Sequence, residues 1–261
     1  MSDPDELFTL RNNFWLGLYQ QALAEGQGLP RQMPEPMRLE KEEYMHRCHI
    51  ALGHGAQVAA GIPDGAPASL QACKLLATYE SQPDNKDMVL LTLGEWLEDP
   101  GSGNNPTLQL LAAQIYCRED NLKEAIKAIR NGVTMEQIAL LAQIYLRMDR
   151  PDLAAKQHRV MVEADEDSAL THMVGAWVCL AAGTPKKAQE AAYVFDELID
   201  KYHASPLLLN CVAVAKMHMG EWAEAEASLL EAVDKPGSGA DTLVNLVACR
   251  SVPRCRNAPR A

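Results

Sequence analysis

A segment near the middle of the chain repeats itself. Residues 113–120 read AQIYCRED, and 29 residues later residues 142–149 read AQIYLRMD. Five of the first six positions match outright, and Asp120 and Asp149 end the two copies. Self-similarity at such a period is typical of stacked repeats, in which each unit buries its apolar face on its neighbours. An array of this kind presents a long surface, which usually binds another protein.

Helical spacing surrounds this repeat. Apolar residues follow the i, i+3, i+4, i+7 pattern in the stretch 108–115, and the stretches 122–129 and 138–145 repeat it. Glycine and proline breakers fall between these stretches, and no segment shows the period-2 alternation of a strand. The sequence therefore predicts an all-α fold over residues 1–248, a tetratricopeptide-like superhelical solenoid of antiparallel helix pairs.

The clearest single unit lies late in the chain. It begins with Gly220-Glu221-Trp222 and continues with small or apolar residues at Ala225, Leu229 and Ala232 before Pro236. This pattern resembles the second half of a tetratricopeptide repeat, in which small residues sit where two helices cross. The repeat of 29 is shorter than the usual length of about 34, which predicts irregular units.

Charge and cysteine content restrict the possible partners and the compartment. The net charge of −11 argues against nucleic acid and against direct docking on an anionic membrane leaflet. Seven cysteines, an odd number, and an acidic N-terminus without an apolar core indicate reduced thiols and no secretory signal. The nearest candidate for a membrane span is the uncharged run at residues 168–185, which is too polar to be convincing.

Several groups invite a chemical interpretation. His46, Cys48, His49 and His54 cluster within nine residues, but their spacing differs from that of a tetrahedral metal site. The acidic run 163–167 is expected to be a solvated loop before a helix. The Gly-Ser-Gly segments at 101–103 and 237–239 follow no strand and are read as turns. We therefore predict no catalytic, cofactor or metal site, and an enzyme lacks support.

A series of short motifs runs in order along the chain. They are DELF at 5–8, RNNF at 11–14, GLYQQ at 17–21, EWL at 95–97, GNN at 103–105, DED at 165–167, AWV at 176–178, LLN at 208–210 and TLVNLV at 242–247. Together they make the chain similar to the coatomer epsilon subunit family over roughly residues 5–248. The EWL and GNN motifs look most like its plant and green-algal branch.

The resemblance implies a function that no spacing shows. Members of the family are non-catalytic structural subunits of the COPI vesicle coat. Their curved solenoid grips the C-terminal region of the coatomer alpha subunit and stabilises it, in support of Golgi-to-ER retrograde and intra-Golgi transport. The resemblance thus implies a cytoplasmic protein, peripheral on Golgi membranes and COPI-coated vesicles, that reaches the membrane through its partners.

Polar residues on the first helices of the repeats are the candidate partner-binding residues. Tyr116, Tyr145 and Trp177 occupy comparable places there, where most aromatic residues pack in the core. Polar neighbours are better placed to hydrogen-bond an extended or hairpin segment on a concave face. The predicted binding set is Gln114, Gln143, Trp177, Asn210 and Asn245.

Another tetratricopeptide-type adaptor is the alternative function, one that holds an acidic peptide tail of a different partner in a basic clamp. The acidic net charge and the scarcity of lysine on the first helices argue against it.

The C-terminus departs from the family pattern. Leu243, Leu246 and Val247 begin an apolar face whose next member would be Arg250, and two prolines then prevent continuation of the helix. The family normally continues for further helices after this point. The sequence predicts a solenoid that ends without a polar cap and a disordered Arg/Pro-containing tail over residues 249–261, as a splice variant or an altered reading frame would produce.

Overall fold

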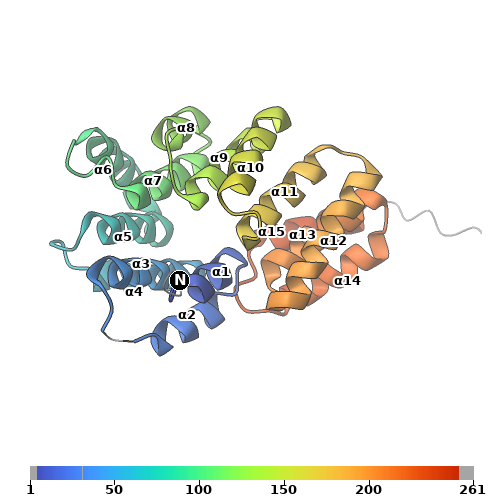
Figure 1. The fold of residues 1–261 in the computed structure, drawn as a ribbon, viewed down its shortest axis with the longest axis horizontal. Helices are drawn as coiled ribbons and strands as arrows, with labels where there is room; N and C mark the ends of the chain where they lie inside the picture. The colour runs from blue at the N-terminus through green and yellow to red at the C-terminus, as the bar shows by residue number, and fades with distance from the viewer. Residues whose placement is uncertain (1–4, 31, 253–261) are drawn as a thin grey trace, which may run out of the picture. The chain divides into compact units, whose positions relative to one another are not determined.

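The chain is helical throughout the part that the structure describes. The computed structural model describes residues 5–30 and 32–252, in which fifteen α-helices and one 3-10 turn occur without any strand. The predicted all-α fold is confirmed. The helices divide between two compact units, residues 1–178 and residues 179–261 (Figure 1).

The first unit consists of antiparallel helix pairs. In chain order its helices are α1 (Phe8–Trp15), α2 (Tyr19–Gly28), α3 (Glu35–Ala51), α4 (Gly55–Gly61), α5 (Ala68–Ser81), η1 (Pro83–Asn85), α6 (Lys86–Glu98), α7 (Pro106–Arg118), α8 (Leu122–Ile129), α9 (Met135–Arg147) and α10 (Pro151–Ala164). The helix α11 (Ala169–Ala181) crosses the boundary between the units. The first helices of successive pairs pack on one another, α1 on α3, α3 on α5, α5 on α7 and α7 on α9.

The second unit continues the same construction. It contains α12 (Pro185–Tyr202), α13 (Pro206–Met219), α14 (Trp222–Val233) and α15 (Ala240–Ser251). Helix α13 packs against α12, α14 and α15, so it is the centre of this unit. Ala225 and Leu229 of α14 are fully buried beside α13, as the tetratricopeptide-like pattern predicts for small and apolar residues at a helix crossing.

The apolar core of the first unit consists of several clusters along the stack of helices. The largest runs from Ile50 of α3 to Ile144 of α9 and includes the fully buried Leu93, Leu108 and Leu111. Another joins α1, α2 and α3, and a third joins α9, α10 and α11. Successive helices therefore bury apolar faces on their neighbours, as expected of stacked repeats.

A left-handed residue follows the first helix in most pairs. A residue with positive φ occupies this place at Gly17, Gly53, Asp120, Asp149 and Gly220. Glycine adopts this conformation without steric cost, and aspartate is among the few other residues that tolerate it. These positions mark the register of the repeats.

The repeated octapeptide ends on two of these turns. Asp120 and Asp149 have φ values of 57° and 56°. In both copies the backbone N–H that follows the aspartate donates to the tyrosine carbonyl five residues earlier, at 2.9 Å to Tyr116 and 2.8 Å to Tyr145. This 6→1 hydrogen bond closes the C-terminal end of α7 and of α9. The shared Tyr and Asp are therefore two ends of one turn.

Helix α15 runs to Ser251, so it includes the first three residues of the segment assigned to the tail. Cys249 is fully buried against α14, and Arg250 pairs with Glu226 at 2.7 Å. The apolar face expected on this helix is divided, because Leu246 is buried while Leu243, Val244 and Val247 are more than half exposed. Residues 253–261 lie outside the described residues.

The left-handed turn at Asp149 provides a test of the repeat register. Asp149 is exposed, and a glycine there would remove the steric cost of the left-handed conformation. We expect Asp149→Gly to raise the free energy of unfolding by up to about 1 kcal/mol and Asp149→Val to lower it by about 1–2 kcal/mol. Urea unfolding followed by circular dichroism measures both changes.

The matched control is Asp167→Gly. Asp167 is an exposed loop aspartate outside the set of residues with positive φ. Glycine there adds freedom to the unfolded chain without relieving strain, so it should destabilise the protein by about 0.4–1 kcal/mol. Equal destabilisation by glycine at both positions would show that the turn at Asp149 stores no strain.

Candidate partner-binding face

Two of the predicted residues lie at equivalent positions on helices in contact. Gln114 on α7 is half-buried and Gln143 on α9 is exposed. Neither side-chain amide has a hydrogen-bond partner among the described residues. Both amides are thus available to a molecule that lies along this face.

The same helix face carries two further polar residues closer to the helix starts. Thr107 lies seven residues before Gln114, and Glu136 lies seven residues before Gln143. Seven residues make almost two helical turns, so each pair shares a face at a separation of about 10 Å along the axis. We call the side of α7 and α9 that carries Thr107, Gln114, Glu136 and Gln143 the inner face.

The helix-start end of the inner face is occupied by the chain's own side chains. The Arg47 guanidinium of α3 donates two hydrogen bonds to the Glu136 carboxylate, at 2.7 and 2.9 Å. The indole N–H of Trp15, on α1, donates to the same carboxylate at 3.0 Å. The Thr107 hydroxyl donates to Glu43 of α3 at 2.8 Å. Helices α1, α3, α7 and α9 are therefore joined at this end.

Arg47 is one of the few charged residues buried in the described part of the chain. Its side chain is 6% exposed, and its guanidinium lies over the rings of Phe14 and Tyr44, 4.3 and 5.0 Å from their centroids. Burial alone lowers the pKa of Arg47, but the Glu136 carboxylate more than offsets that effect, so the pKa is raised above its ordinary value. The group remains a cation with a matched partner and two aromatic faces.

Burial also shifts the pKa values of the groups that neighbour Arg47. The pKa of Glu43 is raised by burial, with the Ser69 and Thr107 hydroxyls and Arg47 opposing the shift. The pKa of Tyr44 is raised well above its usual value by burial and then by the charge of Glu136. Burial raises the pKa of Cys73 to about 12, which keeps this thiol protonated and unreactive.

The start of α9 positions Glu136. Thr134 caps the helix, with its hydroxyl accepting from the Gln137 backbone N–H at 3.2 Å, and the Gln137 side chain bonds back to the cap in a capping box. Gln137 also donates to Gln109 of α7 at 3.0 Å, which ties the start of α9 to its neighbour. Glu136 stands in the first turn, where the helix dipole favours a carboxylate.

The other predicted residues are engaged in packing or in hydrogen bonds. Trp177 is half-buried against the apolar cluster of α9, α10 and α11, and Tyr116 and Tyr145 pack in the core as expected for these aromatics. In the second unit Asn245 donates to Asn210 at 3.2 Å, and Asn210 donates to the Pro206 carbonyl at 3.0 Å. The two asparagines form a ladder between α13 and α15.

The remaining sequence expectations concern loops and metal ligands. Residues 163–167 span the end of α10 and the loop before α11 and are exposed, and residues 101–103 form a turn between α6 and α7. Within residues 5–30 and 32–252, no group of three or more His, Cys, Asp or Glu side chains is arranged to hold a metal ion. Across the same residues, no helix is both long and apolar enough to span a bilayer.

Sequence reasoning missed Arg47, Glu136 and Trp15. The Thr134-x-x-Gln137 spacing of a capping box is a signal that could have put Glu136 at a helix start, but nothing in one sequence pairs it with an arginine 89 residues away. The local signal at Arg47 is weak, because the same face of α3 carries a second charged residue, Glu43, beside the apolar Tyr44 and Cys48.

Comparison with solved structures identifies the fold. The solved structure of a tetratricopeptide repeat protein from Parabacteroides merdae superposes with a TM-score of 0.57, at 14% identity, over 89% of this chain and 85% of that one. The fold is that of a tetratricopeptide-type α-solenoid.

Sequence similarity narrows the class. A profile of the coatomer epsilon subunit matches residues 3–253. Coatomer subunit epsilon-1 of Arabidopsis thaliana is 44% identical over 249 residues, which cover 95% of this chain and 84% of that protein. The Dictyostelium discoideum coatomer subunit epsilon is 34% identical over 95% of this chain and 85% of its own length. The chain belongs to the coatomer epsilon subunit family, and it is a structural coat component rather than an enzyme.

The buried ion pair provides a stability test. Glu136→Gln preserves size but leaves the buried Arg47 without a countercharge, so we expect a loss of about 3–5 kcal/mol in the free energy of unfolding. The double variant Arg47→Met with Glu136→Gln should recover much of that loss, because no unpaired charge remains. Urea unfolding of the single and double variants measures both effects.

Glu35→Gln is the control for this test. Glu35 lies 4.0 Å from Arg38 in an exposed pair, and exposed pairs contribute about 0–1 kcal/mol. If Glu136→Gln were as mild as Glu35→Gln, the Arg47–Glu136 pair would not hold α3 and α9 together.

Proposed function

We propose that this coatomer subunit binds and stabilises the C-terminal region of the coatomer alpha subunit through the inner face. The observation that carries this proposal is the pair of unpartnered amides at Gln114 and Gln143, on two helices in contact. Each amide offers both a donor and an acceptor, which suits the backbone of an extended or hairpin segment.

The ion pair at the other end of the inner face supports the proposal. The Arg47–Glu136 pair joins α9 to α3, and the Thr107–Glu43 hydrogen bond joins α7 to α3, so the helices that carry the glutamines are held in place before a partner arrives. A preorganised face reduces the ordering cost of binding, so more of the contact energy appears as affinity. The partner would gain most where the amides meet it, near the C-terminal ends of α7 and α9.

The proposed setting is the cytoplasmic face of Golgi membranes and COPI-coated vesicles. The protein would be peripheral there, held by the alpha subunit and through it by the rest of coatomer, in support of Golgi-to-ER retrograde and intra-Golgi transport. The net charge of −11 favours this indirect attachment, because an acidic protein is repelled by an anionic leaflet.

A different tetratricopeptide-type adaptor, binding an acidic tail, has weaker support. A basic clamp needs unpaired lysine or arginine on the inner face. Both terminal nitrogens of Arg47 already donate to Glu136. Arg118 and Arg147, one turn beyond the two glutamines, are paired with Glu80 and Asp120.

Co-expression tests the proposed partner. We expect this chain and the C-terminal third of a coatomer alpha subunit to elute together from size exclusion as a stable 1:1 complex. Thermal unfolding of the alpha-subunit fragment should shift upward in the complex, because a ligand that binds only the folded state stabilises it. Separate peaks from two folded proteins would contradict the proposal.

Substitution of the two glutamines tests the proposed face. We expect Gln114→Ala with Gln143→Ala to weaken alpha-subunit binding by about tenfold or more, since each truncated amide leaves a polar group of the partner unpaired. Isothermal titration calorimetry measures the affinity. The control pair, Gln20→Ala with Gln57→Ala, removes exposed glutamines from α2 and α4 and should leave the affinity unchanged. Unchanged affinity in both double variants would exclude the inner face.

A further inference from the structure

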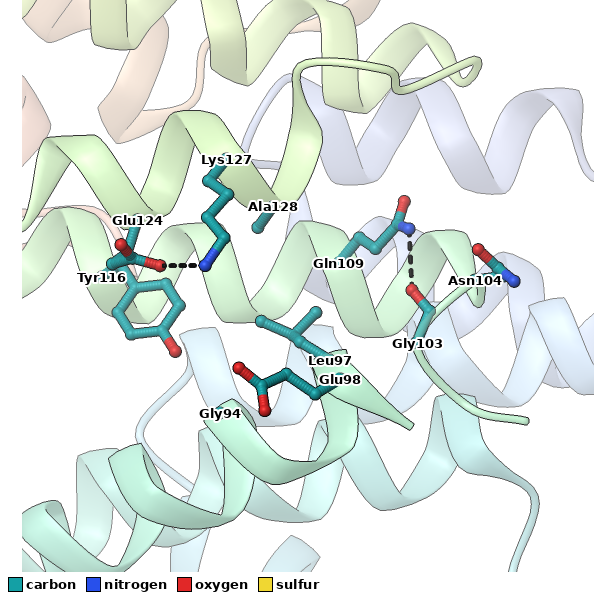
Figure 2. A pocket seen from close by; sticks show the side chains of 10 residues that line it. All are labelled: Gly94, Leu97, Glu98, Gly103, Asn104, Gln109, Tyr116, Glu124, Lys127 and Ala128. Atoms are coloured by element: carbon teal, nitrogen blue, oxygen red, sulfur yellow. Dashed lines mark hydrogen bonds and ion pairs between the residues drawn. The ribbon is translucent and has the colours of Figure 1, made fainter. Parts of the chain in front are cut away.

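A cavity opens between α6 and α8, with α7 as its floor. It has a volume of about 260 Å³ and is lined by residues of all three helices and of the loop before α7, as Figure 2 shows. Helices α6 and α8 are the second helices of their pairs, whereas the inner face belongs to the first helices α7 and α9. The cavity is therefore a separate surface from the one that carries Gln114 and Gln143.

Gly94 leaves the cavity open. It lies in the interior of α6, where glycine is the least favourable residue after proline. A Cβ built on Gly94 would meet no atom within 4 Å outside its own helix, so packing does not require a glycine here. The missing side chain instead exposes the helix backbone to whatever occupies the cavity.

Tyr116 aims an unsatisfied hydroxyl into the cavity. The residue is only 8% exposed, and Figure 2 shows its ring reaching from α7 toward Glu98. The hydroxyl has no hydrogen-bond partner among the described residues. Burial, followed by the charges of Glu124 and Glu98, raises the pKa of Tyr116, so the hydroxyl stays protonated. The ring is buried, but the hydroxyl oxygen itself remains accessible from the cavity, so a ligand there can bond to it.

The charges around the cavity favour a cation. Two carboxylates, Glu98 and Glu124, and one ammonium, Lys127, line it, which leaves one net negative charge. Lys127 pairs with Glu124 at 3.3 Å, while Glu98 has no ion-pair partner among the described residues. Glu98 is thus the free carboxylate of the site, and it lies on the same helix as Gly94, one turn further along.

We propose that the α6–α8 cavity binds a basic peptide segment of a second protein, with one lysine or arginine side chain between Glu98 and Tyr116. The peptide backbone crosses α6 at Gly94, where the absence of a side chain allows close approach. The cationic group donates one hydrogen bond to the Glu98 carboxylate and another to the Tyr116 hydroxyl oxygen, and both are charge-assisted because the donor is ionised. This site does not depend on the proposed grip on the alpha subunit.

The test uses the full chain and synthetic nine-residue peptides built from alanine, serine and leucine. One series carries a central lysine or arginine, and a matched series carries glutamate at the same place. We expect saturable binding of basic peptides by fluorescence anisotropy, weakened as salt rises, and no binding of the glutamate series. Failure of every basic peptide to bind better than its glutamate match would overturn the proposal.

Variants in the cavity locate the binding. Gly94→Val should weaken peptide binding by about tenfold or more without lowering the unfolding midpoint, since valine is the better helix residue and has open space. Glu98→Gln should weaken binding several-fold by removing the charge. Gly61→Val and Glu95→Gln are the controls, because both are exposed and neither lines the cavity. Wild-type affinity in Gly94→Val would overturn the proposal.

The variant Lys127→Ala tests the sign of the charge on the ligand. Removal of this ammonium makes the cavity more negative, so basic peptides should bind more tightly; weaker binding would contradict a cationic ligand. Spermine provides a further check. If spermine binds, no basic peptide binds, and Gly94→Val abolishes the spermine binding, the cavity is a polyamine site and the proposal is overturned.

The co-elution experiment tests whether the two surfaces are independent. Gly94→Val should leave co-elution with the alpha-subunit fragment intact, and loss of co-elution would refute the independence of the two surfaces.

Discussion

The first unit depends on one buried ion pair, although most of the side chains that its helices bury are apolar. Arg47 and Glu136 are separated by 89 residues, and their bidentate contact links α3 to α9 across α5 and α7. In an open solenoid each repeat contacts only its neighbours. Because burying two charges is costly, the contact requires good geometry and additional partners. The Trp15 indole and the rings of Phe14 and Tyr44 supply these partners.

This constraint explains how the two ends of the inner face differ. Near the helix starts, Thr107 and Glu136 bond to α3 and α1, so those polar groups are satisfied within the chain. Two turns further, Gln114 and Gln143 have no such partners among the described residues. The same spacing of seven therefore produces an internal clasp at one end and unpaired amides at the other. Helices that are held rigidly at one end and carry unpaired amides at the other are well suited to bind a peptide backbone, because less free energy is lost in ordering them.

The helices could be predicted from the sequence, whereas contacts between residues far apart in the chain could not. The repeated octapeptide predicted two equivalent helices, and the structure adds that its Asp residues are left-handed turns closed on the shared tyrosines. Asn210 and Asn245 followed the same polar pattern as the glutamines, yet they bond to each other, because α13 and α15 approach closely. The spacing of residues in the sequence does not show whether a side-chain amide bonds to a neighbouring helix or is left available to a partner protein.

The two surfaces of the first unit differ in what the fold itself requires of their residues. Arg47 and Glu136 serve stability directly, so their presence alone says little about a partner. Gly94 and the Tyr116 hydroxyl do not serve stability: the glycine weakens its helix, and the hydroxyl makes no hydrogen bond among the described residues. Local departures of this kind mark functional sites more often than optimised contacts do. Because both departures line one cavity with an unpaired carboxylate, a ligand that satisfies all three accounts for them together.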